Sequence, residues 1–489
     1  MIQQANQYFQ RGQFQQAEHL YRVLLTKNKN DVDALLGLGQ VAMALNSYQQ
    51  AYDIFVRCLS LNTKQIQIYL LLAQAAKFLT RFDKAEQALL AAYQLNKQFI
   101  PSLLALAIYY SEAGKYDLSE NYLKTVVEEE PEHIQAFSLF VKMDKVSLYD
   151  ASLGDYINRM LAKLKSVNDD LSKQDKIMLH YSFAELHHKE EQYAQAFTHF
   201  EQANKLQYEG VDFRVSDMEG YFNDLIETFN KEIFTGTISN PINTEDNQAL
   251  TPIFIVGQPR SGSTLLEQML MGHNKITSGG ELPFMAGSVA QGLLQLTGKN
   301  FPKACELLDK KKQQILADHY LKNLQNLSPN SHYIIDKMPA NYQSIGLIKL
   351  LMPQAKIIYI TRDPLDVSWS IFRNYFESLE PYFCSLKEIA QYHHCYKRVM
   401  LHWQCILPEF IHKVTYQDLI NEPEKTLTTV LSFCGLEFQD ECLNFSQQQR
   451  HIRTLSNVQL RDGIKQKGQS SWRAYREHLQ SLLDDLGIT

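Results

Sequence analysis

Apolar and polar positions along the first 133 residues follow the period of amphipathic helices, and the same arrangement repeats along the chain. An aromatic residue recurs every 34 residues, a small residue follows it after three positions, and a large apolar residue follows after four more. Small residues at fixed positions let two antiparallel helices approach closely, while the aromatic side chain fills the groove between them. The three sets are Phe14, Tyr48, Phe82 and Tyr116, then Ala17, Ala51, Ala85 and Ser119, then Tyr21, Phe55, Leu89 and Leu123.

A further unit of this kind appears out of phase at Tyr193, Ala196 and Phe200. The arrangement resembles the tetratricopeptide repeat, whose period is 34 residues. We therefore predict an N-terminal α-solenoid over residues 1–235, with the repeats clearest at 1–133 and 177–210. Stacked repeats of this kind present a concave surface suited to a peptide or a partner protein. A generic helical bundle is the alternative interpretation.

The hydrophobic pattern changes after residue 235. The stretch GTISNPINTEDNQAL loses its period and gathers Asn, Pro and Thr, so we predict a linker at 236–250. Short apolar runs follow, separated by helical patterns. Strands that are apolar on both faces and alternate with helices indicate a central parallel sheet covered on both sides, in an α/β domain over 251–489. The runs are PIFIV (252–256), HYIID (332–336), KIIYIT (356–361) and FIHKVTY (410–416).

Composition narrows the functional classes. A chain of 489 residues with 45% apolar and 21% charged residues is typical of a globular protein with two or more domains. The net charge of -6 argues against a broad surface for nucleic acid. Seven cysteines without a CxxC pair suit a reducing compartment and give no metal-site spacing. The N-terminus lacks the features of a signal peptide, and no apolar run approaches the ~18 residues of a membrane span, so we expect a cytoplasmic protein without a transmembrane segment.

Candidate chemistry begins where the first apolar run enters GQPRSGSTLLEQML. A strand, a glycine-containing turn and a helix N-terminus together point backbone N–H groups at an anion. Gly257 and Gly262 keep the spacing of the GxxxxGK[ST] nucleotide loop, but the lysine is missing, which argues against ATP or GTP hydrolysis. We predict a smaller anion, with Arg260 as the cation. The anion-binding candidates are Arg260, Ser261, Gly262, Ser263 and Thr264.

A second anion-binding pattern follows the third run, in TRDPLDVSWS. Asp363 is predicted to cap a helix that begins at Pro364, with Asp366 as the acid of a capping box. Arg362 then stands at the end of a strand, and Ser370 lies about two turns into the helix. An arginine and a hydroxyl so placed can hold a phosphate, and such a charge-assisted contact contributes ~1.5–3 kcal/mol. The alternative is that Arg362 pairs with a carboxylate on that helix.

These segments resemble the motifs of sulfotransferases that use 3′-phosphoadenosine-5′-phosphosulfate (PAPS), in the expected order over almost all of residues 250–489. PRSGSTLLEQ is similar to their 5′-phosphosulfate loop, and TRDPLDVSWS is similar to their 3′-phosphate motif. DKMP carries Lys337 where the family has a basic residue beside the transferring sulfuryl group. VTYQDLINEP carries Tyr416, which the resemblance places on the adenine. The stretch TLSNVQLRDGIKQKGQSSWRAY is similar to the closing loop, with Ser456 and Lys465 as its nucleotide contacts.

Within this family, the domain resembles tyrosylprotein sulfotransferases and repeat-fused bacterial relatives. In the former, a glutamate shortly after the first helix is the general base, and the matching residue is Glu281 in ITSGGELP. The resemblance therefore implies Glu281, Lys337 and Arg260 as catalytic residues, with PAPS as the sulfuryl donor and no obligatory metal. Asn374 departs from the pattern, because the tyrosylprotein enzymes have an additional arginine there. Adjacent Arg373 is the candidate replacement.

Several functions stay open at this point. The acceptor hydroxyl can belong to a protein tyrosine, a glycan or a small phenol, and the repeats are expected to dock a partner or the acceptor. A P-loop nucleotide kinase is disfavoured by the missing loop lysine. A repeat scaffold with an inactive catalytic fold is disfavoured by the retention of Arg260, Glu281, Lys337, Arg362 and Ser370.

Overall fold

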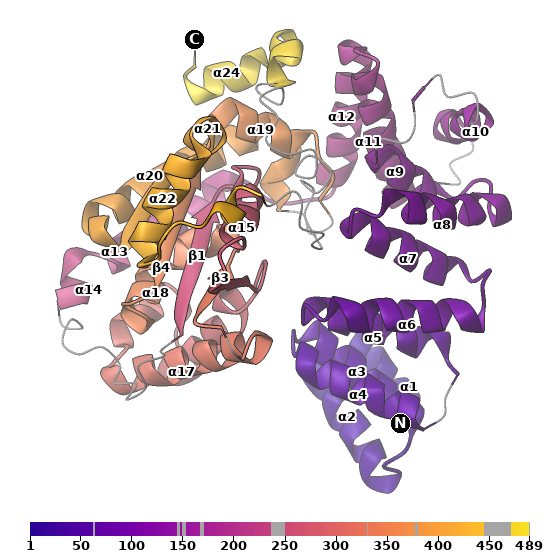
Figure 1. Cartoon of the computed structure of the whole chain (residues 1–489), viewed down its shortest axis with the longest axis horizontal. Helices are drawn as coiled ribbons and strands as arrows, with labels where there is room; N and C mark the ends of the chain where they lie inside the picture. The colour runs from indigo at the N-terminus through magenta and orange to yellow at the C-terminus, as the bar shows by residue number, and fades with distance from the viewer. Residues whose placement is uncertain are drawn as a thin grey trace. The chain divides into compact units, whose positions relative to one another are not determined.

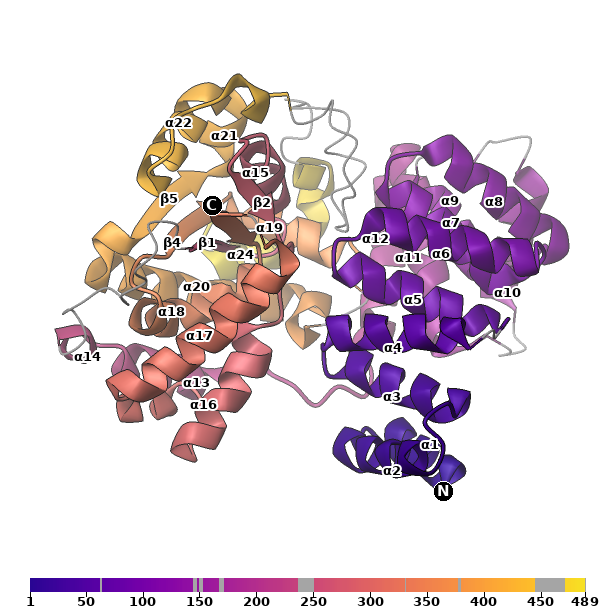
Figure 2. The same ribbon diagram turned by 60° about the horizontal axis from the view of Figure 1, so that its bottom comes forward.

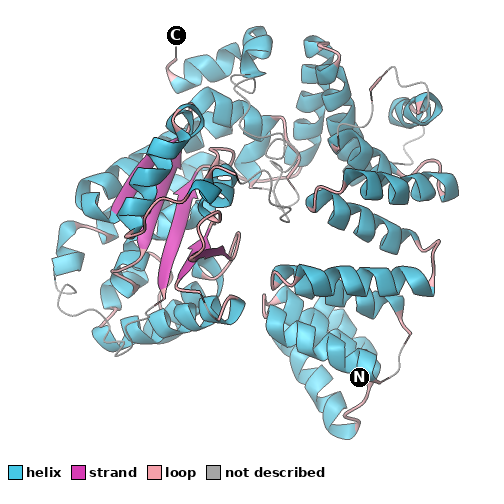
Figure 3. Cartoon of the chain, in the orientation of Figure 1, coloured by secondary structure: helices cyan, strands magenta, loops and turns pink. Residues whose placement is uncertain are grey.

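A computed structural model describes residues 1–488 except 62–63, 144–146, 149–152, 167–170, 236–249, 330, 377–379 and 445–470 (Figure 1). The chain forms two compact units, the first comprising Met1–Lys145 and the second beginning at Val146. The described part of the first unit is helical, and the second contains a parallel sheet among helices (Figure 3). The predicted linker, apart from Leu250, lies outside the described residues.

The first unit consists of helices that pack in antiparallel succession, as the repeat pattern predicts. Phe14, Tyr48, Phe82 and Tyr116 each begin the second helix of a pair, and the small residues three positions later are buried. The helices are α1 (Ile2–Gln10), α2 (Phe14–Lys27), α3 (Val32–Ala44), α4 (Tyr48–Ser60), α5 (Ile66–Phe78), α6 (Phe82–Leu95), α7 (Ile100–Glu112), α8 (Tyr116–Glu129) and α9 (Ile134–Lys142).

Glycines in α3 show how closely the paired helices approach. A Cβ atom at Gly37 would lie 2.3 Å from the ring of Tyr21, and one at Gly39 would lie 2.4 Å from the ring of Phe55. Both rings belong to the large apolar positions of the repeat. The repeat period therefore specifies the helix pairs, and the glycines provide the space that the rings fill.

The second unit is built on a five-stranded parallel sheet with the order β2-β3-β1-β4-β5. Four strands coincide with the predicted apolar runs. The remaining strand, β2, has three residues and gives no apolar run long enough to identify from sequence. The strands are β1 (Thr251–Gly257), β2 (Ile276–Ser278), β3 (Tyr333–Asp336), β4 (Lys356–Thr361) and β5 (Ile411–Thr415).

Helices cover both faces of this sheet, which explains why its strands are apolar throughout. Phe254 and Val256 join a core with helices α13, α17, α18 and α20, whereas α15 packs on β1 and α22 packs on β4 and β5 (Figure 2). The helices of the unit are α10 (Gly154–Lys165), α11 (Lys173–Lys189), α12 (Tyr193–Tyr208), α13 (Glu219–Thr228), α14 (Lys231–Thr235), α15 (Ser263–Leu270), α16 (Ala290–Thr297), α17 (Lys310–Leu327), α18 (Ile345–Leu351), α19 (Pro364–Phe372), α20 (Leu386–Ile406), α21 (Tyr416–Asn421), α22 (Pro423–Cys434) and α24 (Gln480–Leu486).

The helical pair α11–α12 reads as a repeat in the sequence but shares its core with the sheet unit. Phe200 of α12 meets the buried Trp369 of α19 edge to face, with ring centroids 5.6 Å apart. Asn204 of α12 donates from Nδ2 to the carbonyl oxygen of Phe372 at 2.8 Å. These contacts join the helical hairpin to the helix that carries Ser370.

Candidate functional site

The loop between β1 and α15, which we name the anion loop, spans residues 257–264. Its backbone includes positive φ angles, which glycine adopts more easily than other residues. Gly262 has a φ of 102°, and Arg260 has a φ of 69°. A Cβ atom at Gly262 would lie 2.4 Å from the ring of Tyr416, so glycine is needed for this close approach. Ser261, Ser263 and Thr264 are buried. The loop therefore opens α15 with its N-terminal N–H groups at the carboxyl edge of the sheet.

The residues predicted to hold the two ends of a nucleotide meet at this edge. Arg260 donates from Nε to Ser370 Oγ at 2.9 Å. Arg362 donates from Nη1 to the carbonyl oxygen of Arg260 at 3.5 Å, and its guanidinium carbon lies 4.5 Å from the centre of the Tyr416 ring. The ends of β1, β4 and β5 thus bring together Arg260, Arg362, Ser370 and Tyr416.

This cluster carries an excess of positive charge. Burial and, to a smaller extent, the nearby charges of Arg362 and Arg373 lower the pKa of the Arg260 guanidinium to about 10. Arg362 also lies 3.6 Å from Asp366, measured from Nε to Oδ2, so the predicted alternative of a helix-side carboxylate partner is present too. An anion in contact with both Arg260 and Arg362 would relieve their mutual repulsion.

Two buried atoms of the cluster fit an anionic ligand. Ser261 Oγ and Arg362 Nε have no hydrogen-bond partner within the described residues. Both groups are donors, and buried donors in folded proteins are normally paired. Oxygen atoms of a phosphate or phosphosulfate group have the complementary acceptor character.

A second cluster joins the predicted base and the predicted lysine. The pairing of Ser278 on β2 with Ile335 on β3 continues past the strand ends, because Lys337 N donates to the carbonyl oxygen of Gly280 at 2.9 Å. This register places Lys337 Nζ 2.5 Å from Glu281 Oε1. Lys337 is buried, whereas the side chain of Glu281 is 47% exposed, so the carboxylate is open to solvent.

The same lysine has a second carboxylate neighbour that the sequence interpretation missed. Glu267 on α15 lies 3.9 Å from Lys337 Nζ and accepts a hydrogen bond from Ser278 Oγ at 2.5 Å. Burial opposes the charge of Lys337, but Glu267 and Glu281 outweigh it and raise the pKa of the ammonium above its ordinary value. A signal was available, since a glutamate within a helix that is buried on every side requires a partner.

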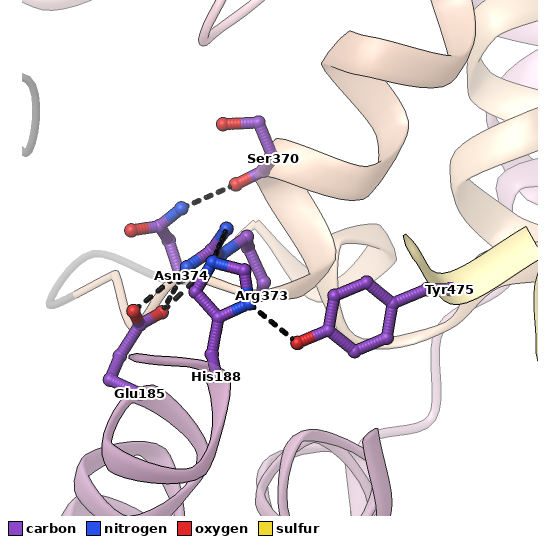
Figure 4. Close-up of polar contacts among 6 residues, drawn as sticks. All are labelled: Glu185, His188, Ser370, Arg373, Asn374 and Tyr475. Carbon is purple, nitrogen blue, oxygen red and sulfur yellow. Dashed lines mark hydrogen bonds and ion pairs between the residues drawn. The ribbon is translucent and has the colours of Figure 1, made fainter. Parts of the chain in front are cut away.

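Arg373, the candidate replacement for the arginine missing at position 374, is held by α11 (Figure 4). Its Nη2 lies 2.9 and 2.8 Å from the two carboxylate oxygens of Glu185, and its Nη1 lies 3.3 Å from His188 Nε2. Asn374 donates from Nδ2 to the carbonyl oxygen of Ser370 at 2.7 Å. The Asn374 side chain therefore stabilises the end of α19 by bonding to the backbone of the helix.

The remaining predicted contacts, Ser456 and Lys465, lie outside the described residues. A further contact to the anion loop comes from α20, where His393 Nδ1 lies 2.9 Å from Oε1 of the buried Gln258. Because the amide oxygen accepts, the imidazole donates from Nδ1. Burial lowers the pKa of His393 to about 4, which keeps the ring neutral near pH 7.

Comparison with known families gives matches for both the repeats and the α/β domain. Residues 252–440 match a family described as "Sulfotransferase family", and residues 8–75 and 66–99 match two descriptions of the tetratricopeptide repeat. The chain carries a sulfotransferase domain behind tetratricopeptide repeats. The predicted fold, an α-solenoid followed by a P-loop-like α/β sulfotransferase domain with a parallel sheet, is confirmed.

Curated relatives match parts of this chain. An uncharacterized protein of Aquifex aeolicus (strain VF5) is 30% identical over 306 residues, which cover 61% of this chain and 40% of that protein. A putative protein-tyrosine sulfotransferase of Caenorhabditis briggsae is 24% identical over 266 residues, covering 48% of this chain and 85% of the relative. Protein-tyrosine sulfotransferase 1 of Danio rerio is 24% identical over 214 residues, covering 41% of this chain and 58% of that relative. The chain thus spans less than half the length of the Aquifex protein.

Solved structures that align with part of the chain include two sulfotransferase domains. The sulfotransferase domain from the curacin biosynthetic pathway aligns with a TM-score of 0.34 and 21% identity, covering 50% of this chain and 99% of that domain. The sulfotransferase domain from the Synechococcus PCC 7002 olefin synthase aligns with a TM-score of 0.34 and 24% identity, covering 48% of this chain and 91% of that domain. Among the described helices, none is long and apolar enough to cross a bilayer.

Proposed function

We propose that this protein transfers the sulfuryl group of PAPS to an acceptor hydroxyl. The observation that carries the proposal is the meeting of Arg260, Ser370 and Arg362 beside the ring of Tyr416. Two anion-binding groups flank one aromatic ring at neighbouring strand ends. This arrangement suits a nucleotide that is anionic at both its 5′ and its 3′ position.

In this proposal each described residue has a separate binding role. The anion loop and Arg260 hold the 5′-phosphosulfate, with Ser261 Oγ as an available buried donor. Arg362 and Ser370 hold the 3′-phosphate, and Tyr416 packs on the adenine. Ser456 and Lys465 complete the closing loop in the same proposal.

The chemistry falls to the second cluster. PAPS supplies an activated sulfuryl group whose leaving oxygen gains negative charge. Glu281 takes the proton from the acceptor hydroxyl, a step that contributes ~10²–10⁴-fold to the rate. Lys337, whose pKa is raised by its carboxylate neighbours, stays cationic and stabilises the leaving phosphate. The sulfuryl group carries less charge than a phosphoryl group, so the proposal assigns no step to a metal.

Protein tyrosine is the first candidate acceptor. Two relatives are named as protein-tyrosine sulfotransferases, one of them putatively. The resemblance to tyrosylprotein sulfotransferases implies that Glu281 is the general base. The repeats would then dock the acceptor protein or a partner. A glycan hydroxyl and a small phenol are the alternatives. A nucleotide kinase is disfavoured, because Ser263 occupies the position of the phosphate-binding lysine.

The donor half of the proposal is tested by nucleotide binding. We expect adenosine 3′,5′-bisphosphate to bind more tightly than AMP or ATP, and Arg362→Ala to weaken the bisphosphate far more than AMP. Tighter binding of ATP, or equal losses for both nucleotides, would contradict the donor assignment.

The acceptor half is tested with ³⁵S-labelled PAPS and a cell lysate, with Glu281→Gln as the matched inactive control. Label that enters protein and is recovered as sulfotyrosine supports the tyrosine assignment. Label that enters polysaccharide or small molecules identifies one of the alternatives.

A further inference from the structure

Glu267 lies on the buried side of Lys337. Its side chain is 7% exposed, and all of the other residues of α15 are buried with it. One carboxylate oxygen lies 3.9 Å from Lys337 Nζ, and the other accepts from Ser278 Oγ. Ser278 Oγ in turn accepts from Gly280 N at 2.9 Å. Glu267 thus contacts the lysine directly and reaches the turn before Glu281 through one hydroxyl.

The two carboxylates beside Lys337 have different roles in the proposed reaction. Glu281 is the exposed partner, and it becomes neutral when it accepts the proton of the acceptor hydroxyl. At that moment Lys337 loses one counter-charge while the leaving phosphate gains negative charge. A buried ammonium without a permanent partner would tend to lose its own proton. Glu267 is buried away from the acceptor and is held by Ser278 Oγ and Lys337, so it takes no part in the proton transfer.

We propose that Glu267 is a positioning residue that keeps Lys337 charged and aimed at the leaving group while Glu281 exchanges protons. Its contact with Ser278 also fixes the turn that carries the base. This inference rests on the proposed function for its catalytic consequence. The effect of Glu267 on the charge of Lys337 is measurable without turnover.

The charged groups that face Lys337 come from three elements. Glu267 lies on α15, Glu281 lies on the turn after β2, and Asp336 precedes the lysine on β3. Burial acts against the ammonium, and the three carboxylates act in its favour. Glu267→Gln keeps the shape and removes one charge, so the pKa of Lys337 should fall.

The direct test follows Lys337 Nζ by NMR in ¹⁵N-lysine-labelled full-length protein, with the signal assigned by Lys337→Arg. We expect Glu267→Gln to lower the titration midpoint, and Glu306→Gln, at an exposed glutamate, to leave it unchanged. An unchanged midpoint in Glu267→Gln would overturn the inference, even where sulfuryl transfer is confirmed.

The catalytic consequence is read from kinetics. Glu267→Gln should lower kcat by roughly 10-fold to 100-fold, leave the KM for PAPS within about twofold, and move the alkaline limb of the rate profile to lower pH. A merely structural glutamate would not move that limb. If Glu267→Gln does not fold, Ser278→Ala serves as the second variant, with a lowered kcat expected and a retained kcat counting against the role of the turn. A wild-type protein that neither binds nor uses PAPS refutes the proposed function, and the catalytic role of Glu267 with it.

Discussion

Arg373, which ends α19, forms an ion pair with Glu185 of α11 in which Nη2 lies 2.9 and 2.8 Å from the two carboxylate oxygens. Ser370, three residues earlier on the same helix, contacts Arg260 of the anion loop. The helical pair that looks like a repeat in the sequence therefore supports the helix that presents a proposed donor-binding residue.

Truncation should reveal this dependence. Deletion of residues 1–145 removes the first compact unit and should leave a folded protein that binds adenosine 3′,5′-bisphosphate normally. Deletion of 1–235 also removes Phe200 and Asn204 from the core under α19, and should give an unstable protein. Circular dichroism and nucleotide titration separate the two results. A stable, binding-competent product of the longer deletion would contradict this dependence.

The solenoid itself should matter for a large acceptor. If the repeats dock the acceptor, deletion of residues 1–145 should raise the KM for a macromolecular acceptor and spare turnover of a small surrogate. Steady-state kinetics with both acceptors measures the effect. Unchanged kinetics on the macromolecule would reject the docking role.

The ion pair should contribute measurably to stability because both side chains are largely buried, at 15% and 31% exposure. Glu185→Ala should lower the free energy of unfolding by about 1–3 kcal/mol. A double-mutant cycle with Arg373→Ala isolates the coupling. The exposed pair Lys425–Glu422 is the control and should show a coupling below about 1 kcal/mol. Equal coupling for the two pairs would show that α11 does not anchor α19 through this contact.

The roles of Glu281 and Lys337 should differ in how their substitution changes the pH dependence of kcat. Glu281→Gln should lower kcat by about 10²-fold or more with nearly unchanged donor affinity, and should remove the acidic limb of the rate profile. Lys337→Ala should also lower kcat but keep that limb. Wild-type turnover of Glu281→Gln on the true acceptor would show that the base lies elsewhere.

Gly262 offers a test with a matched control. Gly262 and Gly298 both have positive φ, at 102° and 72°, but only a Cβ at Gly262 meets another group, the ring of Tyr416. Alanine at Gly298 should cost about 1 kcal/mol of stability, and alanine at Gly262 should cost more because its Cβ also collides with the Tyr416 ring. Only Gly262→Ala should weaken binding of adenosine 3′,5′-bisphosphate, by roughly tenfold or more. Equal affinity for the two variants would show that the approach of Tyr416 to the loop is not required.

His188 should make stability depend on pH. Burial and the charge of Arg373 lower its pKa to about 4, below the ordinary value of about 6.5. The unfolded chain therefore binds the proton more readily, and stability should rise with pH between about 4 and 6.5 and fall as the solution is acidified through that window. His199 and His393, also lowered to about 4, act in the same direction. His188→Gln should flatten the slope of the unfolding midpoint against pH. An unaltered slope would remove His188 as a contributor.

Patterns that depend on neighbours in sequence predicted most of the fold. The aromatic of each repeat begins a helix, and Asp363 caps α19 by accepting from Leu365 N and Asp366 N, as expected. Four strands also lie where apolar runs predicted them. These features follow from helix period, capping and burial, which act over a few residues.

Contacts between distant segments could not be read in the same way. Nothing near Arg373 in the sequence indicates that Glu185 is its partner, and β2 is too short to give a pattern. Glu267 is an intermediate case: its burial within α15 demanded a partner, but the identity of Lys337 as that partner depends on the sheet order. The proposed roles of the site residues remain predictions for the experiments above.

The packing of α12 against α19 also bears on how the chain folds during synthesis. Synthesis proceeds from the N-terminus, so the solenoid and the hairpin α11–α12 are complete before Trp369 and Tyr416 have been added. During that interval the aromatic face of α12, with Phe197 and Phe200, lacks the tryptophan that later packs on it. We therefore expect the nascent chain to be most vulnerable to misassembly between the completion of α12 and that of α19, when a ribosome-associated chaperone would meet an uncovered aromatic surface.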